Sequence, residues 1–584
     1  MANEEIFDFV IVGGGPNGIA LAAYLGKCGA SVCVLEERTE AGGAVDNVEP
    51  IPGVRLTPHA MYMYAGPAPG FDQLELWKYG FRMDWSPMSE NLMQQKDSGI
   101  KVSDGISQIT DKDMMGWGKL AGVTTEKPYI RELLRSIFWT PPHPAEVEVT
   151  ADNIPYMQVY KQNDPSIWTE ELLDMTMFDL MDEYCETEPF KVMQAAVAWY
   201  SGAAGHWEGV AIPALGCDIT LTLYSGLSVP RGGMHDYFHA TIRAAIANGA
   251  IIRTCCPVDE IIIENGVAKG VRLRETATSN ENTVWAKKAV ISNVDVRQTF
   301  KDLVGPKHVG ASFLRKVNDI SLKGGSIWVS HLITKQPLRP REKFKTPGMS
   351  EPGQVGGPFP CDHRDIYYEH VADVDGKKGI PSVPPERLMW LATQSDRFSK
   401  QESQCTVPGW YLESPYYVLV PPPEYEQDDP ETIKSDPNFK GVRPGTVDAQ
   451  KEGINAYMRK AFSIVLENLD DDLIMHLANT PYESEFRNTG LIGGTWCGTR
   501  HCDDQWGENR PIPELARYRT PIDGLYLCNQ TSCHPGGLAL MAIPYNLMHI
   551  LIEDGLVEPG DWWYASPWYI PESGKIPANK NGVK

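Results

Sequence analysis

A glycine-rich segment near the N-terminus has the residue types and spacing needed to bind the diphosphate of a dinucleotide. It reads Gly13-Gly14-Gly15-Pro16-Asn17-Gly18 and fits the pattern G-x-G-x-x-G. In this pattern Gly13 permits a tight turn, Gly15 lets the backbone approach a pyrophosphate, and Gly18 allows a helix to pack closely on a strand. The free N–H groups at the start of that helix would face the phosphates.

A carboxylate follows at the spacing expected of a ribose ligand. Glu36 lies about 20 residues beyond the glycine segment, where an acidic side chain accepts hydrogen bonds from a ribose diol. The same negative charge would repel a 2′-phosphate, so we do not expect NADP to bind here.

These residues need a strand, a helix and a second strand to position them. Phe7 to Val12 is a short apolar run typical of a buried parallel strand. Ile19 to Lys27 reads as a helix that Gly29 ends, and Ser31 to Leu35 reads as the second strand. The complete context predicts a Rossmann-type dinucleotide site.

The residues after Glu36 distinguish FAD from NAD. Glu37 and Arg38 are followed by Gly42, Gly43 and Ala44. This run resembles the FAD-binding extension of the amine oxidase and phytoene desaturase superfamily, in which the glycine pair lets the backbone approach the cofactor. The chain has no second G-x-G-x-x-G, so a separate NAD(P)H domain is not evident. No redox Cys-x-x-x-x-Cys follows Glu36 in this run, which argues against a disulfide reductase.

A middle segment continues the resemblance. A helical pattern begins at Met234, with Met234, Phe238, Ile242 and Ile246 on one face, and β-rich sequence follows from Ala250 to Ile291. It is similar to the phytoene desaturase family, where a valine at the position of Val258 meets the adenine.

After the N-terminal glycine motif, a C-terminal segment gives the strongest indication of a cofactor-binding site. Residues 518–528 resemble the family's Y-R-T-P-I-x-G-L-Y-L-x-G motif, and His534 to Gly537 match its H-P-G-G. Residues 539–552 read as a helix. The resemblance therefore predicts cofactor contacts from Asn529, Gly536, Gly537 and Leu538. Asn529 stands where the family usually has glycine, and bulkier residues replace the family's glycine-rich start of the helix. We therefore expect FAD binding to be kept, but the known substrates of the family are a poor guide to the substrate of this chain.

The resemblance implies an α/β fold. We expect a Rossmann-type, glutathione reductase-like FAD-binding domain from residues 1–84, 222–299 and 485–556. A discontinuous α+β substrate domain would comprise residues 85–221 and 300–484, and residues 557–584 would form a C-terminal extension. Apolar and aromatic density in the second domain favours a lipophilic substrate, although the same composition also suits an ordinary core.

Two histidines are the candidate catalytic residues. In this superfamily, hydride passes from a C–H bond to flavin N5, and the protein positions the reactants. His59 falls where family members carry a histidine, and His534 lies in the turn expected near the flavin ring. Either could carry a proton or donate a hydrogen bond to flavin, and either could be structural. The sets Cys497/His501/Cys502 and Cys528/Cys533/His534 lack the tighter spacing of structural zinc, so we expect no metal site.

Composition limits the partners. The net charge of −23 disfavours nucleic acid as a main partner. No apolar run approaches the ~20 residues that cross a bilayer, and the N-terminus lacks the order of a signal peptide. We therefore expect a cytoplasmic protein with reduced cysteines. Peripheral membrane contact and oligomerisation stay open, and the aromatic segment 561–569 suits either a partner chain or the protein's own surface.

The leading functional hypothesis is FAD-dependent dehydrogenation or desaturation of an isoprenoid, terpenoid or alicyclic compound. The alternatives are a redox-neutral isomerase or hydratase that uses reduced FAD, an amine oxidase, and a non-catalytic binding protein. The sequence does not identify the electron acceptor.

Overall fold

A computed structural model describes most of the chain. The described residues are 5–60, 63–64, 67–85, 110–121, 130–163, 166–200, 204–211, 214–215, 227–230, 233–279, 282–321, 326–339, 341, 358–359, 361, 363–375, 381–388, 390–392, 404–420, 451–495, 498, 505–530, 533–536 and 539–572. They include every predicted cofactor residue except Gly537 and Leu538, which lie outside them.

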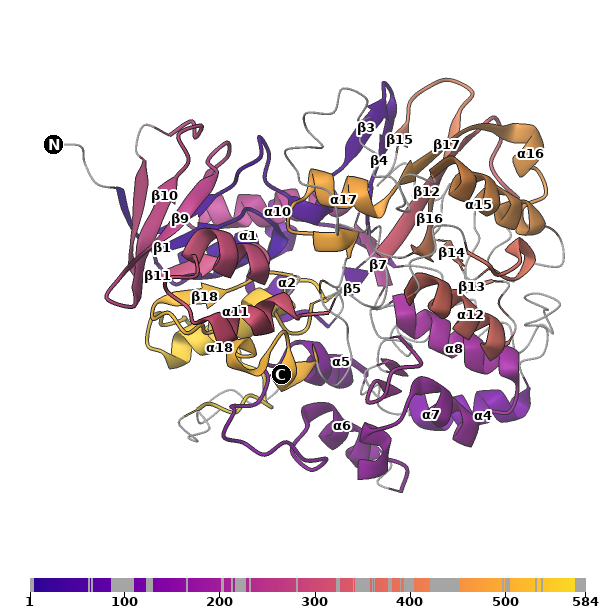
Figure 1. Ribbon diagram of the computed structural model, residues 1–584, viewed down its shortest axis with the longest axis horizontal. Coiled ribbons are helices and arrows are strands. Elements are labelled where there is room, and N and C mark those ends of the chain that lie inside the picture. Colours follow the sequence, from indigo (N-terminus) through magenta and orange to yellow (C-terminus); the bar gives the residue numbers. More distant parts are fainter. Residues whose placement is uncertain are drawn as a thin grey trace.

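The largest sheet stands at the left of Figure 1 and contains the N-terminal strand. Its order is β8-β2-β1-β11-β10-β9, and β18 pairs with the second half of β11. Neighbours among β8, β2, β1, β11 and β18 run parallel, whereas β9, β10 and β11 form an antiparallel meander. The strands are β1 (Glu5–Val12), β2 (Val32–Leu35), β8 (Ile251–Arg253), β9 (Val258–Glu264), β10 (Val267–Leu273), β11 (Thr283–Ser292) and β18 (Leu525–Leu527).

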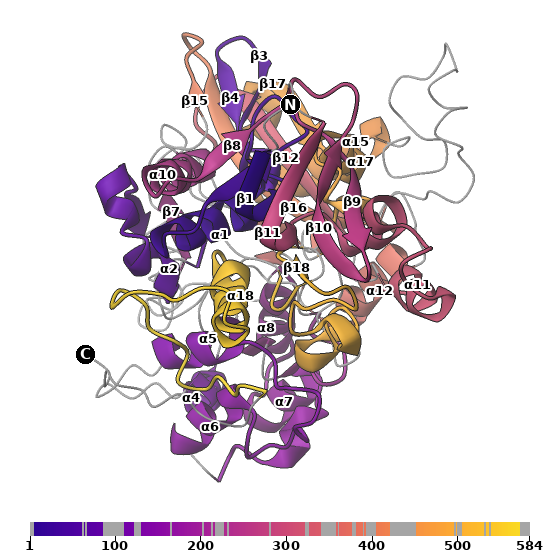
Figure 2. The same cartoon turned by 90° about the vertical axis from the view of Figure 1, so that its left-hand side faces the viewer.

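Burial on both faces explains the apolar sequence of the parallel strands. All four residues of β2 and the last four of β1 are buried. Helix α1 (Pro16–Lys27) packs against α10 (Met234–Ala247) and α18 (Ala542–Glu553), and its residues from Asn17 to Gly26 are buried. Figure 2 shows these three helices beside the sheet. The small side chains of α1 permit this close packing.

The predicted apolar face of α10 is correct at its start and wrong at its end. Met234 and Phe238 are buried, whereas Ile246 is 56% exposed. Ile246 lies twelve residues after Met234, which places it about 120° around a helix of 3.6 residues per turn. Thr241 and Ala245 continue the buried stripe instead.

A second sheet belongs to the other half of the molecule. Its order is β13-β14-β16-β12-β17, with antiparallel neighbours. Helices α12 and α15 contact it, and a group of helices from α4 to α8 lies below it in Figure 1. The elements are β12 (Ser326–Thr334), β13 (Pro358–Phe359), β14 (Trp390–Ala392), β16 (Tyr411–Val420), β17 (Leu473–Asn479), α12 (Arg364–Asp375), α15 (Lys451–Val465), α4 (Asp111–Ala121), α5 (Ile130–Phe138), α6 (Pro155–Asn163), α7 (Met177–Tyr184) and α8 (Glu188–Tyr200).

Two three-stranded sheets, β15-β4-β3 and β5-β7-β6, complete the strands that are described. The remaining elements are short. They are η1 (Gly43–Val45), β3 (Val48–Ile51), β4 (Val54–Leu56), β5 (Met63–Tyr64), α2 (Pro69–Gln73), η2 (Leu76–Tyr79), β6 (Met83–Trp85), η3 (Glu170–Leu173), β7 (Leu227–Pro230), η4 (Gln298–Val304), α11 (Ala311–Asn318), η6 (Pro385–Arg387), β15 (Gln404–Cys405), α16 (Leu469–Asp472), α17 (Pro481–Arg487), η8 (Ile492–Gly494), η10 (Gly507–Asn509) and η11 (Pro513–Leu515).

The aromatic C-terminal segment packs on its own chain. Trp562 stacks on Tyr24 of α1 with ring centroids 6.0 Å apart, and Trp563 meets the same ring edge-on. The backbone carbonyl of Tyr564 accepts hydrogen bonds from Gln73 and Tyr545. This segment therefore covers α1 and α18. Among the described residues, no helix is both long and apolar enough to span a membrane.

Candidate dinucleotide-binding site

The parallel strands of the large sheet end in one row. Val12 of β1 is in register with Leu35 of β2 and with Ser292 of β11, and Ser292 is in register with Leu527 of β18. The residues that follow therefore lie at one edge of the sheet, although they are up to about 500 positions apart in the chain. In open α/β sheets the carboxyl edge of the parallel strands is where ligands bind.

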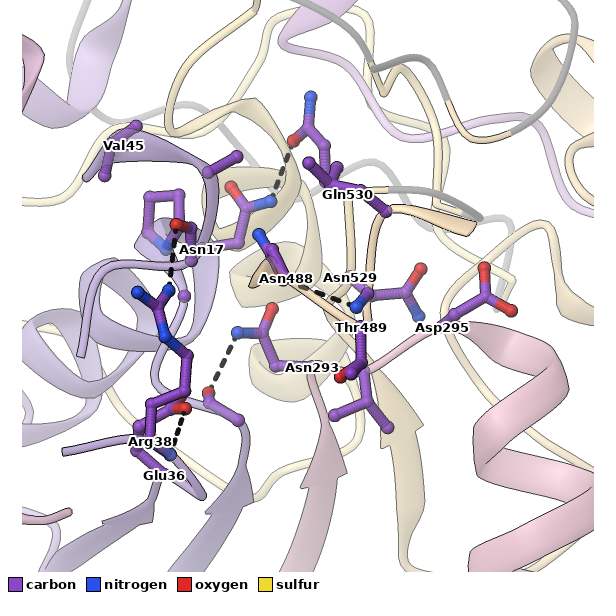
Figure 3. Close-up of a pocket in the computed structure, with 18 of the residues that line it drawn as sticks. Asn17, Glu36, Arg38, Val45, Asn293, Asp295, Asn488, Thr489, Asn529 and Gln530 are labelled. Carbon is purple, nitrogen blue, oxygen red and sulfur yellow. Dashed lines mark hydrogen bonds between the residues drawn. The ribbon is translucent and has the colours of Figure 1, made fainter. Parts of the chain in front are cut away.

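A cavity of about 290 Å³ opens at this edge. Figure 3 shows polar side chains from several sequence-distant segments pointing into it. Twelve of the predicted site residues line it, and these are Gly13, Gly15, Pro16, Asn17, Glu36, Glu37, Arg38, Gly43, Ala44, His59, Val258 and Asn529.

The glycine-rich turn leaves the start of α1 open to a ligand. Gly15 is the N-cap of α1, and no side chain caps this helix. A Cβ on Gly15 would meet only Asn293 Nδ2 within 4 Å, at 3.3 Å. Gly18 has a different role, because its Cβ would lie 2.7 Å from the carbonyl oxygen of Gly13. The turn is thus less crowded at Gly15, where a Cβ would meet one amide nitrogen, than at Gly18, where it would overlap backbone; this suits a pyrophosphate that approaches at Gly15.

The second glycine pair faces the first turn. A Cβ on Gly43 would lie 3.2 Å from the Cα of Gly15, so the two backbones approach closely. Arg38 holds this loop, since its guanidinium donates to Asp46 Oδ2 at 3.0 Å and to the Gly43 carbonyl at 3.5 Å. Gly42 does not line the cavity; its N–H donates to the Gly14 carbonyl and closes the loop.

The Glu36 carboxylate is held in place by the backbone. One oxygen accepts from the Gly14 N–H at 2.7 Å and the other from the Arg38 N–H at 2.9 Å. Burial raises the pKa of Glu36, and the two backbone hydrogen bonds oppose that rise. The carboxylate is thus oriented toward the cavity with further lone pairs left to accept from a ribose diol.

Backbone pairing joins Val258 to this end of the cavity. The N–H groups of Cys255 and Cys256 donate to the carbonyls of Arg38 and Glu36, each at 2.8 Å. These two hydrogen bonds extend the parallel pairing of β2 with β8 beyond the last residues of both strands. Val258, two residues further at the start of β9, then lines the cavity and is 7% exposed.

Several lining residues were missed by the site prediction. Asn293 follows β11 directly, and its Nδ2 donates to the Gly13 carbonyl at 2.9 Å, while Asn17 Nδ2 donates to Gln530 Oε1 at 2.9 Å (Figure 3). Thr489 donates to Glu37 at 2.9 Å. The position of Asn293 after a buried parallel strand was a usable signal. The loop containing Thr489 carries no comparable pattern.

His59 lines the cavity, and its two ring nitrogens have different surroundings. Its Nδ1 lies 3.2 Å from the Ala44 carbonyl, and because a carbonyl only accepts, Nδ1 must carry the hydrogen. Nε2 is buried with no hydrogen-bond partner among the described residues. Burial lowers the pKa of His59 to about 4, so the ring is neutral at pH 7 and Nε2 is an acceptor. Of the two roles expected from sequence, this geometry suits the proton carrier.

His534 does not line the cavity. Its Nε2 bonds the Ile137 carbonyl at 3.2 Å, and its ring packs edge-on against Trp506 at 4.9 Å. Burial lowers the pKa of His534 to about 3. Gly536 also lies away from the lining residues, where a Cβ would overlap the guanidinium of the buried Arg510. The expected cofactor contact of Gly536 and the catalytic role of His534 stay predictions.

The far end of the cavity is built by the second sheet. Ile327 and Val329 of β12, Tyr417 of β16 and Leu540 line it together with His59. Tyr417 donates its hydroxyl to the His59 carbonyl at 2.8 Å, which ties β16 of the second sheet to the segment between β4 and β5. None of these five side chains is charged when His59 is neutral.

Only one of the two cysteine–histidine sets considered from sequence lies among the described residues. Cys528 and Cys533 are buried, and burial raises the pKa of the Cys533 thiol to about 12, which disfavours the thiolate that metals need. His534 is engaged with Ile137. Cys497, His501 and Cys502 lie outside the described residues.

Comparison with known proteins agrees with this fold. A family model described as an NAD(P)-binding Rossmann-like domain matches residues 11–78. The chain is 24% identical to rat (Rattus norvegicus) pyridine nucleotide-disulfide oxidoreductase domain-containing protein 2, covering 94% of each chain. It is 21% identical to one of the subunits of limonene dehydrogenase from Castellaniella defragrans, covering 96% of this chain and 97% of the relative.

Among solved structures, wild-type putrescine oxidase with bound putrescine superposes with a TM-score of 0.51 at 13% identity, covering 95% of this chain and 100% of the other. The predicted α/β class with a Rossmann-type nucleotide-binding domain is therefore confirmed. The relatives indicate an oxidoreductase with a flavin or pyridine-nucleotide cofactor. They do not single out the phytoene desaturase family, so that finer resemblance stays a prediction.

Proposed function

We propose that the chain is an FAD-dependent dehydrogenase that oxidises a neutral, apolar small molecule. The observation that carries the proposal is the paired approach of the Gly15 and Gly43 backbones beside the uncapped start of α1, with the Glu36 carboxylate held at the same cavity. This arrangement fits a pyrophosphate and an adjoining ribose.

FAD suits the cavity better than NAD. The lining extends from Val258 and Glu36, past Asn293, to Asn529 and Gln530 and then to the second sheet. A dinucleotide lying along this path would have its adenosine at Val258 and its redox ring near His59. The Arg38–Asp46 ion pair supports this reading, because it braces the glycine pair that resembles the FAD-binding extension.

Bound FAD would supply a two-electron acceptor for C–H oxidation. The chain's own residues bind and orient it: the first turn of α1 would donate to the pyrophosphate, and Glu36 would accept from the ribose. His59, which lines the cavity and has no hydrogen-bond partner at Nε2 among the described residues, would accept the proton there. The apolar side chains of Ile327, Val329 and Leu540 would exclude water around the substrate.

The uncharged far end favours a neutral substrate over an amine. Its lining combines aliphatic side chains with a histidine whose lowered pKa keeps it neutral at pH 7. An alicyclic or isoprenoid hydrocarbon would match this lining. The whole-length likeness to the limonene dehydrogenase chain, whose name specifies an alicyclic terpene, supports the same substrate class.

The first test measures the FAD content of the purified protein, and the second measures reduction of the flavin by candidate substrates. Protein purified and heat-denatured should release one FAD per chain, and anaerobic mixing with cyclic and acyclic terpenes should bleach the flavin absorbance. A colourless preparation that cannot be reconstituted with FAD would refute the proposal. Turnover only after pre-reduction, without net electron uptake, would identify an isomerase or hydratase instead. Hydrogen peroxide release with amines would identify an amine oxidase.

A further inference from the structure

Three side chains with metal-binding atoms meet on the surface beside the Gly43–Val45 turn. They are Glu40, which precedes that turn, and His235 and His239 of α10. One ligand atom from each lies within 4.8 Å of the other two. His235 Nε2 is 3.0 Å from Glu40 Oε1, and His239 Nε2 is 4.0 Å from the same oxygen.

The spacing of the two histidines follows from the helix. Residues four apart occupy one face of an α-helix, one turn from each other. The two imidazole rings accordingly lie 4.2 Å apart between centroids, with planes inclined by 62°. Glu40 comes from a separate segment, so the three groups converge only because α10 packs beside the η1 turn.

The backbone fixes the tautomer of His235 in the form that binds metals. Its Nδ1 lies 3.1 Å from the Val45 carbonyl and must donate to it. In the neutral ring, Nε2 then carries the lone pair and points at Glu40. Metal-ligating histidines usually donate their second nitrogen to a carbonyl or carboxylate in this way.

We infer that Glu40, His235 and His239 form a binding site for a divalent transition-metal ion, with Zn²⁺ the best match. Two imidazoles and one carboxylate are a known three-ligand zinc set, with a fourth position open to water. Tetrahedral zinc bonds of about 2.0–2.2 Å place ligand atoms roughly 3.3–3.6 Å apart, which lies between the 3.0 Å and 4.0 Å separations of Glu40 Oε1 from His235 Nε2 and His239 Nε2. Glu40 is 62% exposed and His239 is 42% exposed, so rotation of these side chains can close the site.

The ion would join two parts of the dinucleotide site. His235 is bonded to Val45, and Gly43 to Val45 line the cavity. A metal held by α10 and Glu40 would therefore brace this turn from outside. The sequence-based expectation of no metal site concerned the cysteine–histidine sets and did not cover Glu40, His235 and His239. The inference does not depend on the proposed oxidation, because it rests on surface ligands outside the cavity.

The test uses flavin-loaded, chelator-treated protein titrated with Zn²⁺ against a chromophoric zinc chelator that absorbs outside the flavin bands. We expect one Zn²⁺ per chain in the micromolar range or tighter. Glu40→Gln and His239→Gln should each weaken binding at least about tenfold. Zn²⁺ should also raise the unfolding temperature of the wild type but not that of His239→Gln.

His363→Gln is the matched control. His363 is 45% exposed and lies 3.3 Å from Asp365, so it has the same exposure and a carboxylate neighbour but belongs to no three-ligand group among the described residues. Its substitution should leave Zn²⁺ binding unchanged. Less than one equivalent bound by the wild type would overturn the inference. So would equal binding by the wild type and the two ligand variants.

Discussion

Two turns leave the same edge of the large sheet, one after β1 and one after β18, on either side of β11. Both carry consecutive glycines before a buried helix, and the sequence predicts both to be cofactor-binding turns. In the structure, Gly13 and Gly15 line the cavity, whereas Gly536 packs over Arg510 and lies away from it. The same local pattern thus faces the cavity in one turn and packs against a buried side chain in the other.

The two candidate catalytic histidines differ in the same way. Each has one ring nitrogen bonded to a backbone carbonyl and one buried nitrogen with no hydrogen-bond partner among the described residues. Only His59 lines the cavity. Burial lowers the pKa of both, so the property that distinguishes them is access to a ligand rather than electrostatics.

The largest expected effect is on acid stability at His534. Its pKa is about 3 in the folded chain and near 6.5 when unfolded, so the unfolded state binds more protons between these values. Stability from this group is present above pH 6.5 and is lost as pH falls. At pH 4 the loss is about 3 kcal/mol. Denaturant unfolding measures the change in the free energy of unfolding between pH 7 and pH 4. In His534→Gln this change should be smaller than in the wild type by about 3 kcal/mol.

His363→Gln, which removes an exposed histidine, controls for the change in composition. It should leave the pH dependence as in the wild type. Equal acid losses in wild type and His534→Gln would show that the neutral, buried state of His534 does not contribute to stability.

The second expected effect separates the histidines by activity. His59→Gln should retain its flavin but lower kcat about a hundredfold, or about 2.7 kcal/mol, because a positioned proton acceptor is lost. His534→Gln should leave kcat within a few-fold of wild type. Since the pKa of His59 is about 4, the wild-type rate should not depend on this group above pH ~5. Stopped-flow measurement of flavin reduction gives both rates. The reverse ranking of the variants would transfer the catalytic role to His534.

The difference between the two turns also explains which site residues could be predicted from the sequence. The Gly13–Gly18 motif, Glu36 and Val258 were predictable because each follows or starts a strand whose apolar pattern is local. Asn293 could have been added, since it directly follows β11. The order of the five-stranded sheet and the contact of Thr489 with Glu37 were not predictable, because both depend on the packing of segments far apart in the chain.

Local patterns did not reveal the first residue of the C-terminal helix or the side chain that Gly536 contacts. The C-terminal helix begins at Ala542 rather than at residue 539, after Met541 in a left-handed conformation. Gly536 is required by Arg510, which lies 26 positions earlier and carries no signal for that role. A resemblance to a family motif identifies such a turn but does not tell whether its residues face ligand or core.

The third prediction compares the glycines directly. Gly536→Ala should destabilise the protein by about 2 kcal/mol, because Gly536 has a φ of +66° and its Cβ would overlap Arg510. Gly15→Ala should cost less, about 0.5 kcal/mol, since Gly15 has a φ of −70° and its Cβ would meet only the side-chain amide of Asn293, at 3.3 Å. It should instead weaken FAD binding at least about tenfold. Chemical unfolding and flavin release measure the two effects, and equal stability losses would contradict the comparison.

The smallest effect tests a hydrogen bond that joins the two turns. Asn17 Nδ2, in the first turn of α1, donates to Gln530 Oε1, three residues after β18. Both residues line the cavity, so the bond sets the distance between the turns on which a ligand would lie. A double-mutant cycle with Asn17→Ala and Gln530→Ala should give a coupling energy of about 1 kcal/mol in the free energy of unfolding. If the turns form one site, a coupling of the same sign should appear in flavin dissociation. Coupling in stability alone would mean that the second turn supports the first without sharing its ligand.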